Sequence, residues 1–322
     1  MKRQLLRPIT GEEIETYKRD GVVCLRGILD LSCVRELEAA IADLMATPPA
    51  SAVSLTNLGL LADRPEDISG FVAGDLWRNS TEEWGNEGYM RGTVLLDERV
   101  AEIDKEKRGH FWSITGSWRQ DERVRELATR SPLPEIAAQL MESRRVFLCG
   151  DGDQILVKPP LTREKTAWHQ DLGYDHLAGS QRIAIRVPCD PETLETGTVR
   201  YLRGSHRDGT EYKVNYFISN MTSPDDPAAA LPDIDGHEAE FDLVHFDVEP
   251  GDLVVHHIGT VHGAGGNASP SQQRRAITIR YCGDDAVYYP RPLAPPVNTP
   301  PKIKKGASVA GDPDIFPPVY PG

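Results

Sequence analysis

The chain has 322 residues, of which 39% are hydrophobic and 26% charged, a composition that excludes wholesale disorder. Asp and Glu outnumber Lys and Arg by 49 to 36, so the net charge is −13 at pH 7. A charge of this sign repels a phosphate backbone, and the densest basic run, residues 302–305, lies in a proline-rich tail, so we expect no nucleic-acid partner.

Two helices are predicted near the N-terminus. Thr10 has the spacing of a capping-box residue for a helix over residues 11–19, and an Asp-Gly turn with a short apolar run follows it. Either Asp30 or Ser32 is expected to cap a longer helix that ends at about Met45, because apolar residues recur there at three- and four-residue steps. Both helices are expected to bury one face.

The next part of the chain has a weaker pattern. Over residues 47–118 the periodicity fades while Gly, Asn, Asp and Trp become common, which predicts long, lid-like loops. Helical spacing returns over residues 121–141. Pro132 and Pro134 are expected to divide that stretch into two short helices.

After Arg144 short β-branched runs, separated by turns with Pro and Gly, replace the helical pattern. Strands that follow helices predict a mainly β protein with helices. We expect a double-stranded β-helix (jelly-roll) core with the N-terminal helices packed on its outer face. The expected strands are Val146–Cys149, Gln154–Lys158, Arg182–Val187, Thr198–Leu202, Asp242–Val248, Leu253–His257 and Arg274–Tyr281.

We expect a single domain over residues 1–322. It would comprise a helical N-terminal part (1–143), the jelly-roll core (144–289) and a Pro-rich tail (290–322). Ten prolines in the 33 residues of the tail exclude a central strand or a long helix there. Apolar residues around Phe316 favour a tail that is ordered and wraps the core.

The candidate chemistry lies in Trp168-His169-Gln170-Asp171. Residues i and i+2 of a strand point to the same face, so His169 and Asp171 can bind one metal from one side. His262, between a predicted strand and a glycine-rich loop, is the candidate third ligand. Two imidazoles and one carboxylate with open positions opposite them form the facial triad of non-haem Fe(II) oxygenases. His-x-Asp alone often arises by chance.

A later arginine strengthens this interpretation. Arg274 opens a predicted strand in which it shares a face with Ala276 and Thr278, while Arg275 falls on an apolar face. We expect the apolar face to pack against helices and the small, polar face to line a pocket. A guanidinium in that pocket can bind a carboxylate with two hydrogen bonds, as recognition of 2-oxoglutarate requires.

The chain resembles the phytanoyl-CoA dioxygenase (PhyH) family of Fe(II)/2-oxoglutarate-dependent oxygenases. His-Gln-Asp with the late His and Arg is the specific part of the resemblance, and other segments support its order. The matching segments are Asp20–Gly27, Lys158-Pro159-Pro160, His169-Gln170-Asp171, Gly197, Gly204-Ser205-His206, Glu249-Pro250-Gly251-Asp252, His262-Gly263, Asn267 and Arg274-Arg275-Ala276.

The resemblance implies roles for particular residues. It implies that the His-Asp-His set binds iron and that Arg274 binds the distal carboxylate of 2-oxoglutarate. Gln154 occupies a position that faces the site in relatives. Lys158 would neutralise an anion near the site or, equally, be a surface lysine. One of His256 and His257 is expected to point inward and the other outward, with no metal role.

This sequence departs from the family pattern at three positions. Arg203 replaces the usual Pro before Gly-Ser-His, and Thr196 replaces an Asn. Arg186 stands where relatives commonly carry a Trp beside the co-substrate. Strand alternation lets Arg186 point into the pocket and pair with an anionic group of the substrate or the co-substrate. The alternative is a surface arginine on an edge strand.

The expected activity follows from these residues and the resemblance. We expect an Fe(II)/2-oxoglutarate-dependent dioxygenase that uses O2 to hydroxylate an unactivated C–H bond of a small polar or anionic metabolite, forming succinate and CO2. Specialised metabolism is one setting, and desaturation or cyclisation are open. Asp171 is present, whereas resembling halogenases replace that carboxylate by a small residue, so oxygenation is favoured. A catalytically inactive jelly-roll binding protein and a cupin-like metal enzyme that does not use 2-oxoglutarate are the alternatives.

The expected setting is the cytoplasm. The five cysteines are scattered, odd in number and without a CxxC pair, which is typical of free thiols in a reducing compartment. The sequence has no run of 18 consecutive apolar residues, so we expect no segment that spans a bilayer. The first residues lack a signal-peptide pattern. We expect a small-molecule partner, no membrane association, and a monomer or homodimer.

Overall fold

The computed structural model describes residues 5–49, 51–56, 109–215, 217–220, 222, 226–291, 293–294 and 299–321. Most of the expected lid-like segment, 47–118, lies outside the described residues. Its described ends contribute two strands, β2 (Ala52–Ser54) and β3 (Trp112–Thr115).

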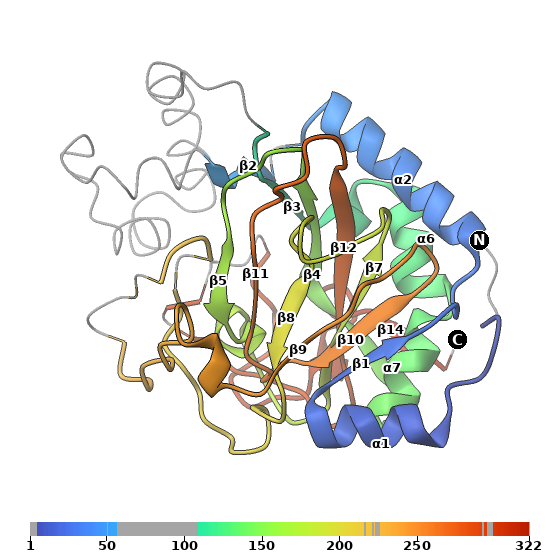
Figure 1. Ribbon diagram of the computed structural model, residues 1–322. Helices are drawn as coiled ribbons and strands as arrows, with labels where there is room; N and C mark the ends of the chain where they lie inside the picture. Colours follow the sequence, from blue (N-terminus) through green and yellow to red (C-terminus); the bar gives the residue numbers. More distant parts are fainter. Residues whose placement is uncertain are drawn as a thin grey trace, which may run out of the picture.

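Strands dominate the described chain after residue 144 (Figure 1). Beside β2 and β3, they are β1 (Val22–Leu25), β4 (Val146–Lys158), β5 (Thr166–His169), β6 (Leu177–Ala178), β7 (Arg182–Pro188), β8 (Val199–Leu202), β9 (Leu243–His245), β10 (Leu253–His257), β11 (His262–Ala264), β12 (Arg274–Cys282), β13 (Val287–Tyr288) and β14 (Pro318–Tyr320).

Two antiparallel sheets face each other across the site. The larger, eight-stranded sheet has the order β1-β10-β7-β12-β4-β3-β2, with β14 paired to β4, and the smaller, four-stranded sheet has the order β5-β11-β8-β9. A third, two-stranded sheet joins β13 and β6. The expected mainly β, jelly-roll architecture is confirmed.

Strand β4 differs most from its prediction, and β9 is shorter than the predicted Asp242–Val248. The sequence predicts two strands, Val146–Cys149 and Gln154–Lys158, whereas β4 runs through both. Its pairing with β12 shifts register in between, since Ile279 lies opposite Asp153 but Tyr281 lies opposite Leu148. The segment 150–153 between the two predicted strands therefore forms a bulge within β4. Gly150 has a φ of +36°, a conformation that favours glycine.

The principal helices are α1 (Gly11–Asp20), α2 (Leu31–Ala46), α6 (Glu122–Arg130) and α7 (Leu133–Met141). The first two begin where the predicted caps place them. Thr10 and Glu13 form the capping box of α1, and Asp30 rather than Ser32 caps α2 by accepting a hydrogen bond from the Ser32 amide. Pro132 precedes α7, so the expected division into two short helices is present.

Helices α2, α6 and α7 cover the outer face of the larger sheet (Figure 1). Ile183, Ile185 and Val187 of β7 pack in the same core cluster as Val34 of α2 and Leu127 of α6. Side chains alternate along a strand, so the intervening residues of β7 and β12 must face the smaller sheet. The apolar face of these strands therefore orients the polar one toward the space between the sheets.

The described part of the C-terminal tail packs on the core. Ile315 and Phe316 are buried beside Phe147, and Val319 reaches the helical core cluster. Strand β14 pairs with β4 through Pro318 opposite Phe147. The expected wrapping tail is present in residues 299–321.

The motifs shared with the family tie the N-terminus to the loop before His262. Gly204 donates its amide to the carbonyl of Asp20 at 2.7 Å, and the Ser205 hydroxyl accepts the Val261 amide at 2.8 Å. Gly21 has a φ of +75°, and a Cβ there would lie 2.3 Å from Nδ1 of His206. Only glycine fits this crossing, and the crossing orients the chain that enters β11.

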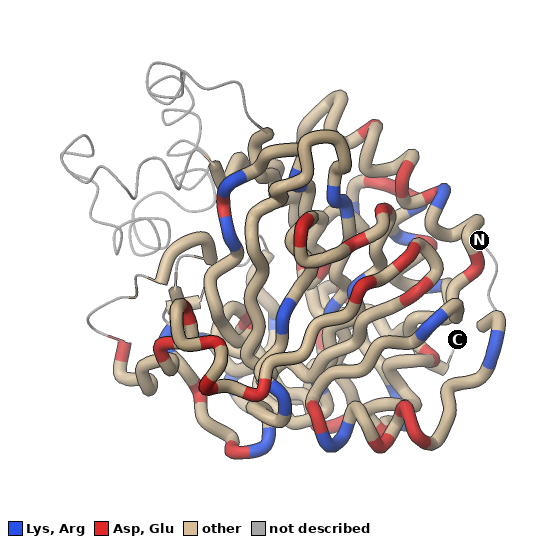
Figure 2. The backbone as a smooth tube through the Cα atoms, in the orientation of Figure 1, with Lys and Arg blue, Asp and Glu red and all other residues tan. Residues whose placement is uncertain are grey.

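The outer surface carries charges of both signs. Figure 2 shows acidic and basic residues interspersed along α1 and α2 rather than gathered by sign. In the part of the chain that the structure describes, none of the helices has the length and apolar character needed to cross a membrane.

Asp153 is a fully buried acid on β4. It accepts hydrogen bonds from the Ser117 hydroxyl and the Trp118 amide, both on one oxygen, while its Oδ1 has no hydrogen-bond partner among the described residues. Burial raises the pKa of Asp153 to about 6, against the opposing effect of these hydrogen bonds.

This pKa makes stability depend on pH. The protonated acid stabilises the folded chain fully below the unfolded pKa, and that contribution is lost as the pH rises through about 6. Between pH 5 and pH 7.5 the unfolding free energy of the unchanged protein should therefore fall. In Asp153→Asn we expect this fall to be smaller by about 1 kcal/mol, as measured by denaturant titration at the two pH values. Asp233→Asn, an exposed control, should leave that pH dependence unchanged; an equal effect in both variants would contradict the assignment.

Candidate metal centre

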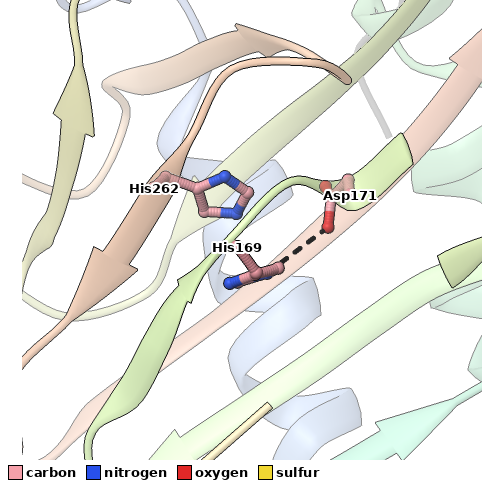
Figure 3. Close-up of side chains that lie close together, drawn as sticks. All are labelled: His169, Asp171 and His262. Carbon is pink, nitrogen blue, oxygen red and sulfur yellow. Dashed lines mark ion pairs between the residues drawn. The ribbon is translucent and has the colours of Figure 1, made fainter. Parts of the chain in front are cut away.

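Three potential ligands converge between the sheets. His169 is the last residue of β5, Asp171 opens the short helix η3 (Asp171–Tyr174), and His262 opens β11 directly opposite His169. One ligand atom from each lies within 4.8 Å of the others, and all three residues are buried (Figure 3). The prediction placed His169 and Asp171 on one strand. The strand ends at His169 and Asp171 begins η3, but Gln170 between them is still extended (φ −107°, ψ 141°), so the two side chains lie on the same side, as predicted.

Hydrogen bonds fix both imidazoles in one tautomer. Nδ1 of His169 lies 2.8 Å from the carbonyl of Ala167, and Nδ1 of His262 lies 2.9 Å from the carbonyl of Thr260. A carbonyl can only accept, so each Nδ1 carries the proton and each Nε2 is left with a free lone pair. Burial lowers the pKa of His262 well below its ordinary value, so this ring is neutral. In its neutral form, an imidazole held in this way presents Nε2 to a metal ion.

Asp171 is oriented by an arginine and a third histidine. Arg280 donates to both of its oxygens, NH2 to Oδ1 at 2.8 Å and Nε to Oδ2 at 3.0 Å, and Nε2 of His256 lies 3.3 Å from Oδ2. Burial alone would raise the pKa of Asp171, but Arg280 and the neighbouring histidines hold it well below its usual range. The carboxylate therefore stays ionised, as a metal ligand must.

The sequence interpretation gave neither of these two residues a role at the metal. His256 points inward, as expected, but it contacts a ligand residue. Arg280 was not singled out, although strand alternation from Arg274 puts it on the pocket face of β12. That alternation could have identified Arg280 as a lining residue. Its contact with Asp171, 109 positions earlier in the chain, depends on the packing of the two sheets.

The triad lies in a pocket between the two sheets. The pocket has an empty volume of about 420 Å³, part of which is open to solvent. Side chains of both sheets line it: Gln154, Leu156, Thr166, His169, Asp171, Arg186, Val199, Tyr201, Phe217, His256, His262, Ala264, Arg274, Thr278 and Arg280, with Gly263.

A second cluster of charges lies beside this pocket. Glu192 accepts a hydrogen bond from NH2 of Arg186 at 2.6 Å, and its other oxygen lies 3.4 Å from Nε of Arg274. Lys158 is directly opposite Arg274 in the β4–β12 pairing and donates to the carbonyl of Gly265 at 2.7 Å. Two arginines thus contact one buried carboxylate, and Lys158 lies beside Arg274.

The structure decides between the alternatives left open for Arg186 and Lys158. Arg186 is 3% exposed on β7, which lies between β10 and β12, so a surface arginine on an edge strand is wrong. Lys158 is fully buried, its ammonium 4.3 Å from the centre of the Phe111 ring, so the surface alternative is wrong here too. The anionic partner of Arg186 in the structure is Glu192.

The cluster has unsatisfied donors, which a bound anion would complete. Burial lowers the pKa of Arg274 to about 10, and Glu192 offsets this only in part. Nε and NH2 of Arg274 are buried without a hydrogen-bond partner among the described residues, as is the Tyr201 hydroxyl. Buried donors are normally satisfied, so this arrangement fits a carboxylate ligand such as one end of 2-oxoglutarate. Gln154, also on the pocket wall, donates to the Ser113 hydroxyl at 3.0 Å.

Comparison with known families and proteins agrees with this geometry. The family model for phytanoyl-CoA dioxygenase (PhyH) matches residues 17–276. A curated relative, the phytanoyl-CoA dioxygenase domain-containing protein 1 homolog of Dictyostelium discoideum, is 22% identical over 285 residues, covering 87% of this chain and 94% of the relative.

Solved structures share the fold at low identity. The α-ketoglutarate-dependent epimerase SnoN from nogalamycin biosynthesis aligns with a TM-score of 0.62 and 20% identity, covering 97% of this chain and 96% of that one. EctD from S. alaskensis, solved with 2-oxoglutarate and 5-hydroxyectoine, aligns with a TM-score of 0.58 and 18% identity over 96% and 93% of the two chains. At this identity the likeness shows the fold.

We expect Arg280→Met to weaken metal binding by about 10- to 100-fold, because Asp171 would lose the two donors that orient it. The measurement is the dissociation constant of Mn(II) or Fe(II), taken without oxygen or co-substrate. Arg275→Met is the matched control: Arg275 lies on the same strand but faces away, paired with Asp190. Equal metal affinity in both variants would show that Arg280 does not orient the ligand.

Proposed function

The chain belongs to the phytanoyl-CoA dioxygenase family, and on this premise we propose that it hydroxylates an unactivated C–H bond of a small, anionic metabolite. It is a 2-oxoglutarate-dependent non-haem iron oxygenase. The observation that carries the proposal is one pocket that holds both the His-Asp-His set and an arginine, Arg274, with unsatisfied donors.

The residues present fit iron and its co-substrate. Nε2 of His169, Nε2 of His262 and the carboxylate of Asp171 would hold Fe(II), a donor set that leaves positions free for other ligands. When bound, this centre supplies the activation of O2 that is coupled to conversion of 2-oxoglutarate to succinate and CO2. Retention of Asp171 favours oxygenation over halogenation.

The protein's own part is to bind, orient and exclude water. We assign the distal carboxylate of 2-oxoglutarate to Arg274, with the Tyr201 hydroxyl as an additional donor beside it. Lys158 and Gln154 lie on β4, next to Arg274's strand in the same sheet. Burial lowers the pKa of Lys158 well below its ordinary value, and Gln154 offers a polar group on the pocket wall. A buried site of this kind keeps solvent away from the reacting C–H bond.

The balance of charge supports an anionic substrate. Arg186, Arg274 and Arg280 line the pocket, against the carboxylates of Asp171 and Glu192. Fe(II) and doubly charged 2-oxoglutarate cancel, so the pocket keeps a positive surplus even with Lys158 neutral. Such a surplus attracts a carboxylate or phosphate. SnoN is an epimerase and SnoK, a further structural relative, a carbocyclase, so substrate placement would decide between hydroxylation and these other outcomes.

The remaining proposals concern the whole chain. We propose that residues 1–322 act as one oxygenase domain. Residues of the four helices α1, α2, α6 and α7 and of β14 share one core cluster with the larger sheet, which supports this. The five cysteines are free, which supports a reducing compartment such as the cytoplasm. A monomer or homodimer with a small-molecule substrate and no nucleic-acid partner is consistent with the net charge of −13.

Anaerobic addition of Fe(II) and 2-oxoglutarate to metal-free protein tests the centre. We expect a visible charge-transfer band of the chelate that is lost in His169→Ala and that requires at least about 10-fold more co-substrate in Arg274→Ala. His237→Ala, an exposed histidine, is the control and should behave as the unchanged protein. Absence of a band in the unchanged protein would favour the cupin-like or inactive alternatives.

Substrate charge can be tested with pairs of compounds. We expect small carboxylates or phosphates to stimulate succinate formation, and their uncharged amides or methyl esters to do so at least about 10-fold less, because the pocket has surplus positive charge. Succinate is measured against product in each reaction. Equal stimulation by charged and uncharged members of the pairs would contradict an anionic substrate.

A further inference from the structure

Glu192 is a buried acid that the proposed reaction does not use. It is 1% exposed and lies four residues after β7. Its backbone is paired with Val248 in both directions, amide to carbonyl at 2.9 Å and carbonyl to amide at 3.0 Å. The backbone is therefore fixed, and the carboxylate stays close to Arg274.

This position creates a conflict for co-substrate binding. Glu192 lies 3.4 Å from Nε of Arg274, the guanidinium assigned to the distal carboxylate of 2-oxoglutarate. Two carboxylates on one guanidinium repel each other strongly in a dry pocket. If Arg274 alone neutralised Glu192, the two residues would form a closed pair with no charge left for a ligand.

Arg186 resolves the conflict. Its hydrogen bond to Glu192 is 2.6 Å long, whereas the contact from Arg274 is longer and lacks hydrogen-bond geometry. Burial would raise the pKa of Glu192, but the ion pairs with Arg186 and Arg274 together lower it, with Arg186 the larger contribution. NH2 of Arg274 therefore has no hydrogen-bond partner among the described residues, and Nε has only the longer contact with Glu192.

We propose that Arg186 is a positioning residue for co-substrate binding that acts through Glu192. By neutralising Glu192 it leaves the Arg274 guanidinium free for the distal carboxylate of 2-oxoglutarate. This inference rests on the proposed function and adds a residue pair to it.

The charge of the three-residue cluster predicts an order of affinities. The unchanged protein has two arginines and one glutamate, a surplus of one positive charge. Arg186→Gln removes the surplus and is expected to raise the dissociation constant of 2-oxoglutarate by at least about 10-fold. Arg186→Gln with Glu192→Gln restores the surplus and should return the constant to within about threefold of the unchanged protein. Glu192→Gln alone should bind at least as tightly as the unchanged protein.

The constants are measured on the Fe(II)-loaded protein without oxygen, from the visible band of the chelate. 2-Oxopentanoate, which lacks the distal carboxylate, serves as the control ligand, and its affinity should not respond to Arg186→Gln. Arg186→Lys keeps the charge and should bind 2-oxoglutarate nearly as the unchanged protein does. Metal affinity and thermal unfolding are compared in all variants.

Several results would overturn the inference while the proposed function stands. They are an unchanged constant in Arg186→Gln, a double variant as weak as that single variant, and a parallel loss of 2-oxopentanoate binding. Should Arg186→Gln not fold, weaker binding by Glu192→Gln would overturn it equally well. A missing band in the unchanged protein is distinct from all of these, because it contradicts the oxygenase assignment itself.

Discussion

Buried charge between two sheets is the constraint on which this molecule depends. A charge removed from water must find a partner, and each carboxylate at the site has one. Asp171 is held by Arg280 and His256, and Glu192 by Arg186 and Arg274. The carboxylates are satisfied, yet donors of Arg274 are not. The unpaired groups at the site are therefore hydrogen-bond donors with positive charge, and an anionic ligand can pair with them.

The fold places these charged groups in the pocket because the two faces of the larger sheet have different surroundings. Isoleucines and valines on one face of β7 and β12 pack under the helices. Any other arrangement would expose this apolar surface to water at a cost in free energy. The alternate residues then have to face the smaller sheet, whatever their polarity. The same pairing of strands places Arg274 beside Lys158 and Thr278 beside Arg186. Hydrophobic burial on one side thus contributes to the close approach of like charges on the other.

Much of the fold could be predicted because it depends on local order along the chain. Capping residues placed the helix starts, and strand alternation assigned Arg274 and Arg186 to the polar face. The prediction for β4 was wrong at its centre because glycine permits both a turn and a bulge, and only pairing with β12 selects the bulge. His169 and Asp171 converge as expected, because Gln170 stays extended although β5 ends at His169.

The sequence by itself determined the composition of the site: its metal-ligand types, its late arginine and the face on which each strand residue lies. These follow from periodicity and from motifs whose members are close in the chain. Only the tertiary structure decided the partners. Arg280 reaches Asp171, and Arg186 reaches Glu192 rather than solvent, because two sheets pack face to face and exclude water. Ion pairing depends on distance and burial in three dimensions, and neither quantity is encoded in the spacing of residues along one strand.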